Sequence, residues 1–426
     1  MTTVKIPYAK KHLELSIPAD RLQGILQSKA ESFTAEADEA TLVKTALANP
    51  IGSPRLAELA KGKKHIVIIT SDHTRPVPSR IISPLLVEEI RSTNPDGKIT
   101  FLVATGFHRA TTEAELNAKF GEAFRKTIDI VIHDSQDDSA MVKIGKLPSG
   151  GSTIVNKLAM EADLLVGEGF IEPHFFAGFS GGRKSVLPGI ASQVTVLYNH
   201  CSQFIDSEKA RTGNLAENPI HKDMLAAAEQ AKLAFILNVV IDAEKKIIKA
   251  FAGHSVKAHE EGCQFVGELA SVKACPADIV VTSNGGYPLD QNLYQSVKGM
   301  SAAEATVKPG GVIIICSACN DGHGGEAFYD WFAKAPGGAS EVMEKIMQIP
   351  AEKTIADQWE AQILARIQLK AHVIVVTDLC DHQMFKDMQV AVTSTLEEAM
   401  AEAEKIVGAK ASITVIPDGV SVIVRP

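Results

Sequence analysis

The first segment that could carry chemistry is residues 70–78, a polar stretch that directly follows an apolar run and precedes a helical pattern. A loop leaving the carboxyl end of a parallel strand is the usual ligand position in α/β proteins. Here Asp72 could orient a catalytic base, and Arg75 could clamp a carboxylate or phosphate, because a guanidinium offers two parallel N–H donors. The same Ser-Asp-x-Thr spacing is typical of a helix N-cap, so this segment alone leaves both interpretations open.

A second segment, residues 104–109, runs from a strand pattern into a glycine turn. His108 in this turn would lie at the carboxyl edge of the sheet, where an imidazole can transfer protons near neutral pH. A single histidine is more often a structural or surface residue. Whether His108 is catalytic therefore depends on which side chains lie beside it in the fold.

The most informative stretch is residues 167–190, which is rich in glycine. Backbone N–H groups and positive charge for a phosphate could come from the turn in its middle, which consists of Ser180, Gly181, Gly182, Arg183 and Lys184. The stretch is not a P-loop, because the GxxxxGK[ST] pattern counted from Gly178 requires glycine where Arg183 stands. No G-x-G-x-x-G opens a helix after a strand, so a conventional dinucleotide site has weak support.

Two histidines lie in and after this stretch, His174 and His200. Twenty-six residues separate them. That is not a recognised spacing for a metal-binding pair, so spacing alone does not predict a metal site.

In the C-terminal part, Gln295 and Lys298 fall on one face of a helical pattern, with Tyr294 beside them. A polar helix face is usually solvated, but this helix begins soon after a strand, which leaves a cleft-facing role equally open. Trp359, one of two tryptophans, lies in a helical stretch and is predicted to be packed, with a cleft-lining position as the alternative.

The elements that must position these residues are short apolar runs alternating with helical patterns. The strand patterns lie at residues 65–69, 99–104, 128–132, 162–166, 234–241, 278–282, 311–316 and 371–377. This alternation predicts an α/β fold with largely parallel, helix-covered sheets. Both ends of the sequence show the alternation of a β-hairpin, at residues 4–17 and 412–424.

A helical pattern at residues 255–272 offers a connector between two series of strands. We therefore predict two α/β domains, residues 1–272 and residues 273–426, with the option that the last strands return to the first domain. The first domain carries the three segments described above and His200, and the second carries Gln295 and Lys298.

Composition narrows the class of protein. The chain has 426 residues and a formal net charge of -8, which argues against nucleic acid or an anionic membrane as the main partner. No signal peptide and no apolar run long enough to span a membrane is visible, so we expect a soluble, cytoplasmic protein. Cys316 and Cys319 have C-x-x-C spacing, but no second such pair accompanies them, and we interpret them as buried thiols at a strand end.

Taken in order, the motifs resemble those of the nickel-dependent lactate racemase family. The resemblance extends over nearly the whole chain and rests on residues 71–76, 106–109, 172–174, 178–189 and 199–200 together with Gln295 and Lys298. It implies two α/β domains with the active site in the cleft between them. It also implies a nickel-pincer nucleotide, a pyridinium mononucleotide (pyridinium-3-thioamide-5-thiocarboxylic acid) tethered to a lysine.

The resemblance further implies a role for each residue that matches the family motifs. Lys184 matches the tethering lysine, in the turn that would hold the nucleotide, and His200 matches the protein ligand of nickel. His108 and His174 match an acid/base pair on opposite faces of the substrate. The supporting and substrate-contacting positions match Asp72, Arg75, Tyr294, Gln295, Lys298 and Trp359.

On this basis we expect an isomerase that interconverts D- and L-2-hydroxy acids, with lactate as the first candidate. The α-hydrogen would move as hydride to the cofactor and leave a planar 2-keto acid, while one histidine takes the hydroxyl proton. Enzymes that synthesise the cofactor would be needed for maturation.

Several alternatives stay open at this stage. Other 2-hydroxy acids, namely malate, 2-hydroxyglutarate, phenyllactate or a sugar acid, fit the same motifs. A phosphate-binding kinase or ATPase is suggested by residues 180–185, although the P-loop pattern is broken. A storage or maturation protein for the nickel cofactor would bind the nucleotide without needing both His108 and His174.

Overall fold

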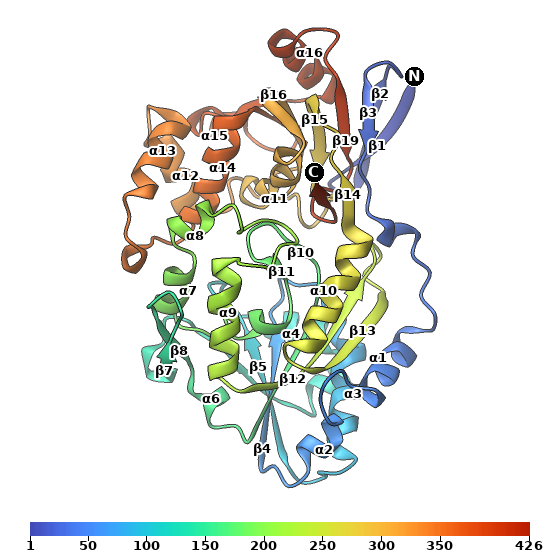
Figure 1. The fold of residues 1–426 in the computed structure, drawn as a ribbon, viewed down its shortest axis with the longest axis vertical. Coiled ribbons are helices and arrows are strands. Elements are labelled where there is room, and N and C mark those ends of the chain that lie inside the picture. Colours follow the sequence, from blue (N-terminus) through green and yellow to red (C-terminus); the bar gives the residue numbers. More distant parts are fainter.

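The computed structural model describes residues 1–426, with the side chain of Glu31 excepted, and contains two six-stranded sheets (Figure 1). The first sheet, in the lower half of Figure 1, has the strand order β13-β12-β9-β4-β5-β6. Its pairs are parallel except β12 with β13. The strands are β4 (His65–Ser71), β5 (Lys98–Ala104), β6 (Asp129–Ile132), β9 (Leu164–Phe170), β12 (Leu233–Ile241) and β13 (Ile247–His254).

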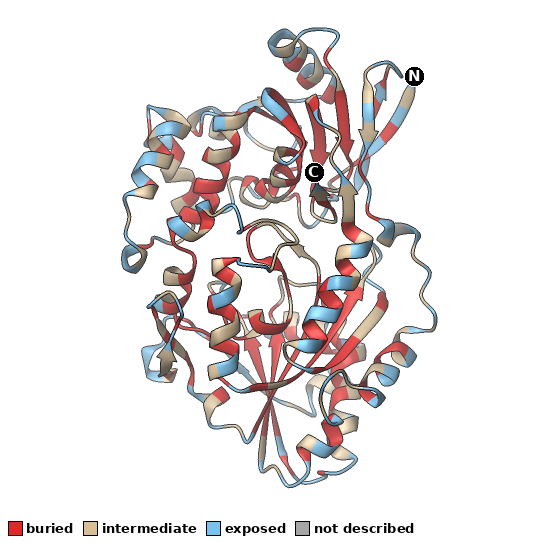
Figure 2. Cartoon of the chain, in the orientation of Figure 1, coloured by how far each residue is buried: buried red, intermediate tan, exposed pale blue. Residues whose placement is uncertain are grey.

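Helices cover both faces of this sheet, as a continuous apolar strand such as β4 requires. Ile66 and Ile68 pack in one cluster with α1 (Glu39–Ala48) and α3 (Ser79–Arg91), while Val67 and Ile69 pack in another with α9 (Pro219–Gln230). All four side chains are fully buried, and the central strands of this sheet are largely red in Figure 2. The other helices of this half are α2 (Leu56–Ala60), α4 (Glu113–Phe120), α5 (Glu122–Arg125), α6 (Lys157–Met160), α7 (Gln193–Asn199), α8 (Ser202–Asp206) and α10 (Lys257–Ala270).

The second sheet is parallel throughout and has the strand order β18-β17-β16-β15-β19-β3. Its strands are β3 (Leu22–Ile25), β15 (Ala277–Ser283), β16 (Val307–Cys316), β17 (His372–Val376), β18 (Ala391–Thr393) and β19 (Ile413–Ile416). Its helices are α11 (Leu293–Glu304), α12 (Glu326–Ala333), α13 (Gly338–Met347), α14 (Gln358–Lys370), α15 (His382–Asp387) and α16 (Leu396–Val407).

The two faces of the second sheet are also covered. One face packs on α11 and α14, and the other packs on α16 and on the hairpin of β1 (Thr2–Tyr8) and β2 (Lys11–Ile17). Three further strand pairs are β7 (Met141–Lys146) with β8 (Ser152–Asn156), β10 (Pro173–His174) with β11 (Gly178–Phe179), and β14 (Ser271–Lys273) with β20 (Ile423–Arg425). Single 3₁₀ turns lie at Lys29–Ser32, Asp138–Ala140, Gly182–Ser185 and Ala351–Lys353.

The predicted fold class is confirmed, and so is the opening hairpin. The second predicted hairpin is wrong, because β19 and β20 do not pair with each other. Instead β19 lies between β15 and β3, and β20 pairs with β14. The alternation of apolar and polar residues in this segment suggested a strand with one exposed face, but every residue of β19 is buried. Its polar residue, Thr414, is accommodated in the interior because its hydroxyl donates to the carbonyl of Cys275.

The division into residues 1–272 and 273–426 stays a prediction. The strand order adds that β3, from the start of the sequence, forms an edge of the second sheet. Among the described residues, none of the helices has the length and apolar character needed to cross a membrane.

Candidate active site

A cavity of about 450 Å³ lies where the loops after β4, β5 and β9 meet α11 and α14. The structure brings almost all of the predicted site residues to its wall. These are Asp72, Arg75, His108, His174, Ser180, Gly181, Gly182, Lys184, His200, Tyr294, Gln295, Lys298 and Trp359. A second cavity of about 400 Å³ adjoins the first, and the two share Arg75, Phe170, His174, Phe175 and Lys298.

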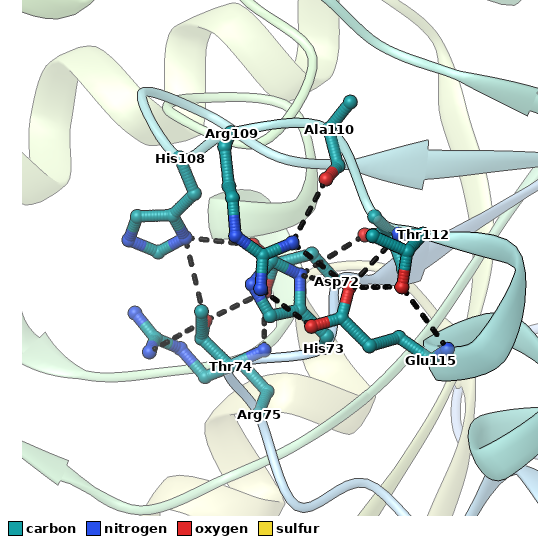
Figure 3. Close-up of polar contacts among 10 residues, drawn as sticks. Asp72, His73, Thr74, Arg75, His108, Arg109, Ala110, Thr112 and Glu115 are labelled. Carbon is teal, nitrogen blue, oxygen red and sulfur yellow. Dashed lines mark hydrogen bonds and ion pairs between the residues drawn. The ribbon is translucent and has the colours of Figure 1, made fainter.

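His108 follows β5 and is bound to Asp72, which follows β4 (Figure 3). The Nδ1 atom of His108 lies 2.7 Å from Oδ2 of Asp72, and the hydroxyl of Thr74 donates to the other carboxylate oxygen at 2.6 Å. Burial would raise the pKa of Asp72, but the hydrogen bond and charge of His108, with Thr74 and Arg75, outweigh it and lower that pKa to about 2. An ionised carboxylate only accepts, so Nδ1 of His108 donates and Nε2 keeps its lone pair.

The loop that carries His108 is held from its outer side (Figure 3). Arg109 donates to both carboxylate oxygens of Glu115, at 2.9 and 2.5 Å. Glu115 in turn accepts from the backbone N–H of Thr112 at 2.8 Å, which closes a capping box at the start of α4. The Arg109 side chain therefore anchors the loop, while the His108 side chain, 43% exposed, stays at the rim of the cavity.

His174 and Lys184 meet inside the cavity, with Nε2 of the histidine 3.1 Å from Nζ of the lysine. Burial, followed by the charges of Lys184, Lys298 and Arg75, holds the pKa of His174 well below its usual range. Burial and the neighbouring cations also hold the pKa of Lys184 well below its usual range. The pair is therefore an imidazole beside an amine that gives up its proton more readily than an ordinary lysine does, and a deprotonated amine is a nucleophile.

The backbone around this pair assigns the imidazole tautomer. The N–H of Ala177 donates to Nδ1 of His174 at 3.3 Å, so the ring proton is assigned to Nε2, which donates to the lone pair of Lys184. His174 is placed by the two-residue pairing of β10 with β11, where it lies opposite Gly178. Gly178 has φ of 81°, a left-handed conformation that favours glycine.

Arg183 is the one predicted cofactor-binding residue that does not reach the wall of the cavity. Its side chain is buried, and its guanidinium donates to the carbonyls of Ala177 at 2.7 Å and Phe179 at 2.8 Å. It also donates to Nδ1 of His221 at 3.0 Å and lies 3.1 Å from Nε2 of His259. Arg183 thus stabilises the turn that presents Lys184. Its guanidinium binds carbonyls of the loop and does not point into the cavity.

His200 presents one ring nitrogen to the cavity. Its Nδ1 donates to the carbonyl of Val196 at 2.9 Å, so Nε2 carries a lone pair. Burial, followed by the charge of Lys184, lowers its pKa to about 3, which keeps the imidazole neutral. The ring lies between Phe176 and Trp359, at centroid distances of 5.3 and 5.0 Å.

The described residues contain no cluster of three or more histidine, cysteine or acidic side chains placed to bind a metal ion. Cys316 and Cys319 are both buried free thiols, as predicted. A metal at His200 would therefore need donors that the chain does not supply.

Two groups of hydrogen bonds hold the side chains of the cavity wall that α11 and α14 contribute. The indole N–H of Trp359 donates to the hydroxyl of Tyr294 at 3.0 Å, and that hydroxyl donates to Asp357 at 3.2 Å. Lys298 donates to the side-chain oxygen of Gln295 at 2.7 Å. These contacts fix the aromatic and the cationic side of the wall relative to each other.

Asn238 and Glu360 are among the polar residues that also line the cavity and that sequence reasoning missed. The side-chain oxygen of Asn238 accepts from the N–H of Gly182 at 2.8 Å and so holds the glycine turn against the sheet. An asparagine inside the apolar run of β12 is a signal that could have indicated this role. Glu360 has no comparable signal, because an acidic residue in the first turn of a helix is common.

Comparison with known proteins places these residues in a family. Models of the lactate racemase N-terminal and C-terminal domains match residues 8–213 and 272–424. A lactate racemase of Thermoanaerobacterium thermosaccharolyticum is 60% identical over 425 residues, and one of Lactiplantibacillus plantarum is 55% identical over the same length, both covering 100% of each chain.

Solved structures agree with this placement. The lactate racemase apoprotein of T. thermosaccharolyticum matches with a TM-score of 0.97 at 59% identity over 100% of both chains. A Thermotoga maritima protein with a TM-score of 0.68 and 18% identity covers 92% of this chain and shares the fold. The resemblance read from the motifs is thereby confirmed, as is the expectation of an isomerase of this type. The chain belongs to the lactate racemase family.

Proposed function

We propose that this chain racemises a 2-hydroxy acid, with lactate as its substrate, by reversible hydride transfer to a nickel-pincer nucleotide attached to Lys184. The observation that carries the proposal is that Lys184, whose amine lies 3.1 Å from Nε2 of His174, lines one cavity together with His108 and His200. The two relatives that match over their full length are named lactate racemases, which supports lactate. Six free cysteines are consistent with a reducing, cytoplasmic location.

The residues present fit such a cofactor. The Lys184 amine is partly enclosed and its pKa is held well below the usual range, which favours the deprotonated form needed to make a covalent link. The lone pair on Nε2 of His200 suits a nickel ion whose other donors are the sulfur atoms of the nucleotide. Ser180, Gly181 and Gly182 line the same cavity and would hold the nucleotide beside the linked lysine.

Racemisation by proton removal at the α-carbon is difficult, because that C–H bond is weakly acidic and the adjacent carboxylate opposes a further negative charge. When bound, the nucleotide would supply an acceptor that takes the α-hydrogen as hydride and returns it. The chain would do the rest: Arg75, Gln295 and Lys298 would bind the carboxylate, and one histidine would take the hydroxyl proton.

The two histidines would act in turn. His108, with its free Nε2, accepts the hydroxyl proton as the substrate becomes a planar 2-keto acid. His174 would enter the cycle in its protonated form, would give that proton to the same oxygen as the 2-hydroxy acid re-forms, and would be left as a neutral imidazole. Reversal of the direction exchanges the two roles, as a racemase requires.

Intact-protein mass and nickel content would test the cofactor directly. The protein is produced together with the cofactor-synthesis enzymes, and we expect a nucleotide-sized adduct on Lys184 and about one nickel per chain. Lys184→Ala should lose the adduct. Lys245→Ala, which changes a lysine of the adjoining cavity, should keep it.

Absence of adduct and nickel from the wild-type protein, while the same enzymes load a known relative, would refute this proposal. The substrate is then set by comparing kcat/KM for D- and L-lactate with those for malate, 2-hydroxyglutarate, phenyllactate and a sugar acid. We expect lactate to give the highest value, and a higher value for any other acid would replace it.

A further inference from the structure

Glu360 is a buried carboxyl group in the cavity that the mechanism above does not use. It lies in the first turn of α14, has an exposure of 0%, and lines the cavity beside Trp359. Neither of its carboxylate oxygens has a hydrogen-bond partner among the described residues. Burial of such a group without a partner costs free energy, so a buried orphan carboxyl on a cavity wall indicates a function toward what the cavity holds.

Lys298, on α11, is a half-buried cation that lines the same cavity. Its amine donates to Gln295, which is neutral, and forms no direct ion pair with Glu360 among the described side chains. Charged and titratable groups surround it from every neighbouring element, namely Arg75 after β4, Glu172 and His174 after β9, Lys184 in its turn, and Glu360 with Asp357 at the start of α14.

We propose that Glu360 is a positioning residue that acts through Lys298: its unpartnered carboxyl, which lines the same cavity as the amine, keeps that amine protonated so that it can bind the substrate's carboxylate. The proposal rests on the proposed function, because it takes the substrate to be a 2-hydroxy acid anion.

The physical argument starts from the desolvation of Lys298. Burial and the charge of Arg75 lower the pKa of this amine, while the negative charges of Glu172 and Glu360 raise it. In the opposite direction, burial raises the pKa of Glu360, and the charge of Lys298 lowers it. Two groups that favour each other's charged form in a desolvated site titrate as a pair.

Substrate binding uses the same coupling. An ammonium group binds a carboxylate, whereas a neutral amine does not contribute a charge. If Glu360 lost its charge permanently, the amine would lose its proton at a lower pH, and the affinity for the anion would fall in the range where the wild-type protein still binds. Both groups line the same cavity of about 450 Å³, which leaves room for a small 2-hydroxy acid beside Lys298.

The test compares KM for lactate in the loaded wild-type enzyme and in Glu360→Gln from about pH 6 to about pH 9. Loss of the carboxylate should make the ratio of variant to wild-type KM grow by about tenfold over this range, the effect of about one pKa unit on the amine. Glu360→Asp, which keeps the charge, should restore much of the wild-type pH profile. A merely structural role would raise KM by a factor that does not change with pH.

The chain offers a matched control on the same two helices. Glu304 on α11 accepts from Arg366 on α14 at 2.9 and 2.7 Å, outside the cavity. Glu304→Gln removes a carboxyl that joins these helices, so it reproduces any loosening of their packing. We expect its KM ratio to stay constant with pH.

Lys298→Arg provides an independent test, should Glu360→Gln fail to fold. A guanidinium keeps its charge throughout this pH range, so the alkaline rise of KM should disappear. A KM ratio for Glu360→Gln that is flat with pH, or an alkaline rise that persists in Lys298→Arg, would overturn the inference. If the loaded wild-type enzyme itself neither racemises nor binds lactate, the proposed function fails and this inference falls with it.

Discussion

His108 and His174 are the same residue type on one cavity wall, yet their surroundings have opposite charge. His108 lies at the rim, 43% exposed, with its Nδ1 on the ionised Asp72. His174 lies deeper, with Lys184 3.1 Å away and Arg75 and Lys298 near enough to hold its pKa down. A carboxylate stabilises an imidazolium, whereas neighbouring cations oppose it.

The comparison indicates that only one of the two proposed bases is ready in the chain alone. His108 can take up a proton, because Asp72 compensates the charge that forms. His174 can become an imidazolium only when the Lys184 amine beside it can no longer be protonated. Conversion of the Lys184 amine into an amide-like link would achieve this, so we expect cofactor attachment to prepare the second base as well.

Removal of either imidazole should have the largest effect, and it tests whether both histidines act as bases. We expect His108→Ala and His174→Ala each to lower the racemisation rate by about 10²–10⁴-fold, the usual contribution of a general acid or base. Mass spectrometry should show the adduct retained in both, and His12→Ala, an exposed histidine on β2, should behave as wild type. Full activity in either cavity variant would refute the two-base scheme.

A smaller effect is expected from Asp72→Asn. The asparagine keeps the size but loses the charge that stabilises the His108 imidazolium, a hydrogen bond to a charged group worth about 1.5–3 kcal/mol, or roughly ten- to a hundredfold in rate. Because the two enantiomers have equal free energy, kcat/KM must fall equally for both, so we expect the difference in kcat, with the greater loss in the direction in which His108 accepts the proton. Equal losses of kcat at saturating D- and L-lactate would show that the carboxylate does not serve His108 alone.

The smallest effect is a titration shift in the protein without cofactor. Lys184→Met removes an amine that competes with His174 for a proton and whose charge, when it forms, opposes the imidazolium, so the pKa of His174 should rise from its depressed position. NMR of the histidine ring protons measures this. The buried His133, whose Nε2 lies 3.0 Å from the carbonyl of Ala191, serves as the internal control and should not move.

Much of the scaffold could be predicted from local pattern alone. The run at residues 65–69 became the central β4, because a parallel strand buried on both faces must be apolar throughout. Its carboxyl end fixed where Asp72 and Arg75 would lie, and the same argument placed His108 after β5. Local pattern did not tell β19 from a hairpin strand, since the burial of Thr414 depends on a carbonyl from residue 275.

The site residues that belong to a sequence motif could be predicted. Those whose role depends on packing against distant residues could not. Arg183 and Lys184 are adjacent, but a 3₁₀ turn has about three residues per turn, so adjacent side chains point about 120° apart. Only Lys184 reaches the cavity, while Arg183 points back to the carbonyls of its own loop. Glu360 becomes notable only once α14 is packed against α11, which no single helix pattern reveals.

The place of β3 at the edge of the second sheet has a consequence for how the chain folds. Leu22 pairs with Ile413, so two segments from opposite ends of the printed sequence must meet before that edge is complete. Contacts between such distant residues form slowly, because a long loop must close first. During synthesis β3 would emerge early but would have no partner strand until β19 is made. The first sheet, built from residues 65–254, can assemble before then. We therefore expect the first sheet to gain protection from hydrogen exchange before the second during refolding.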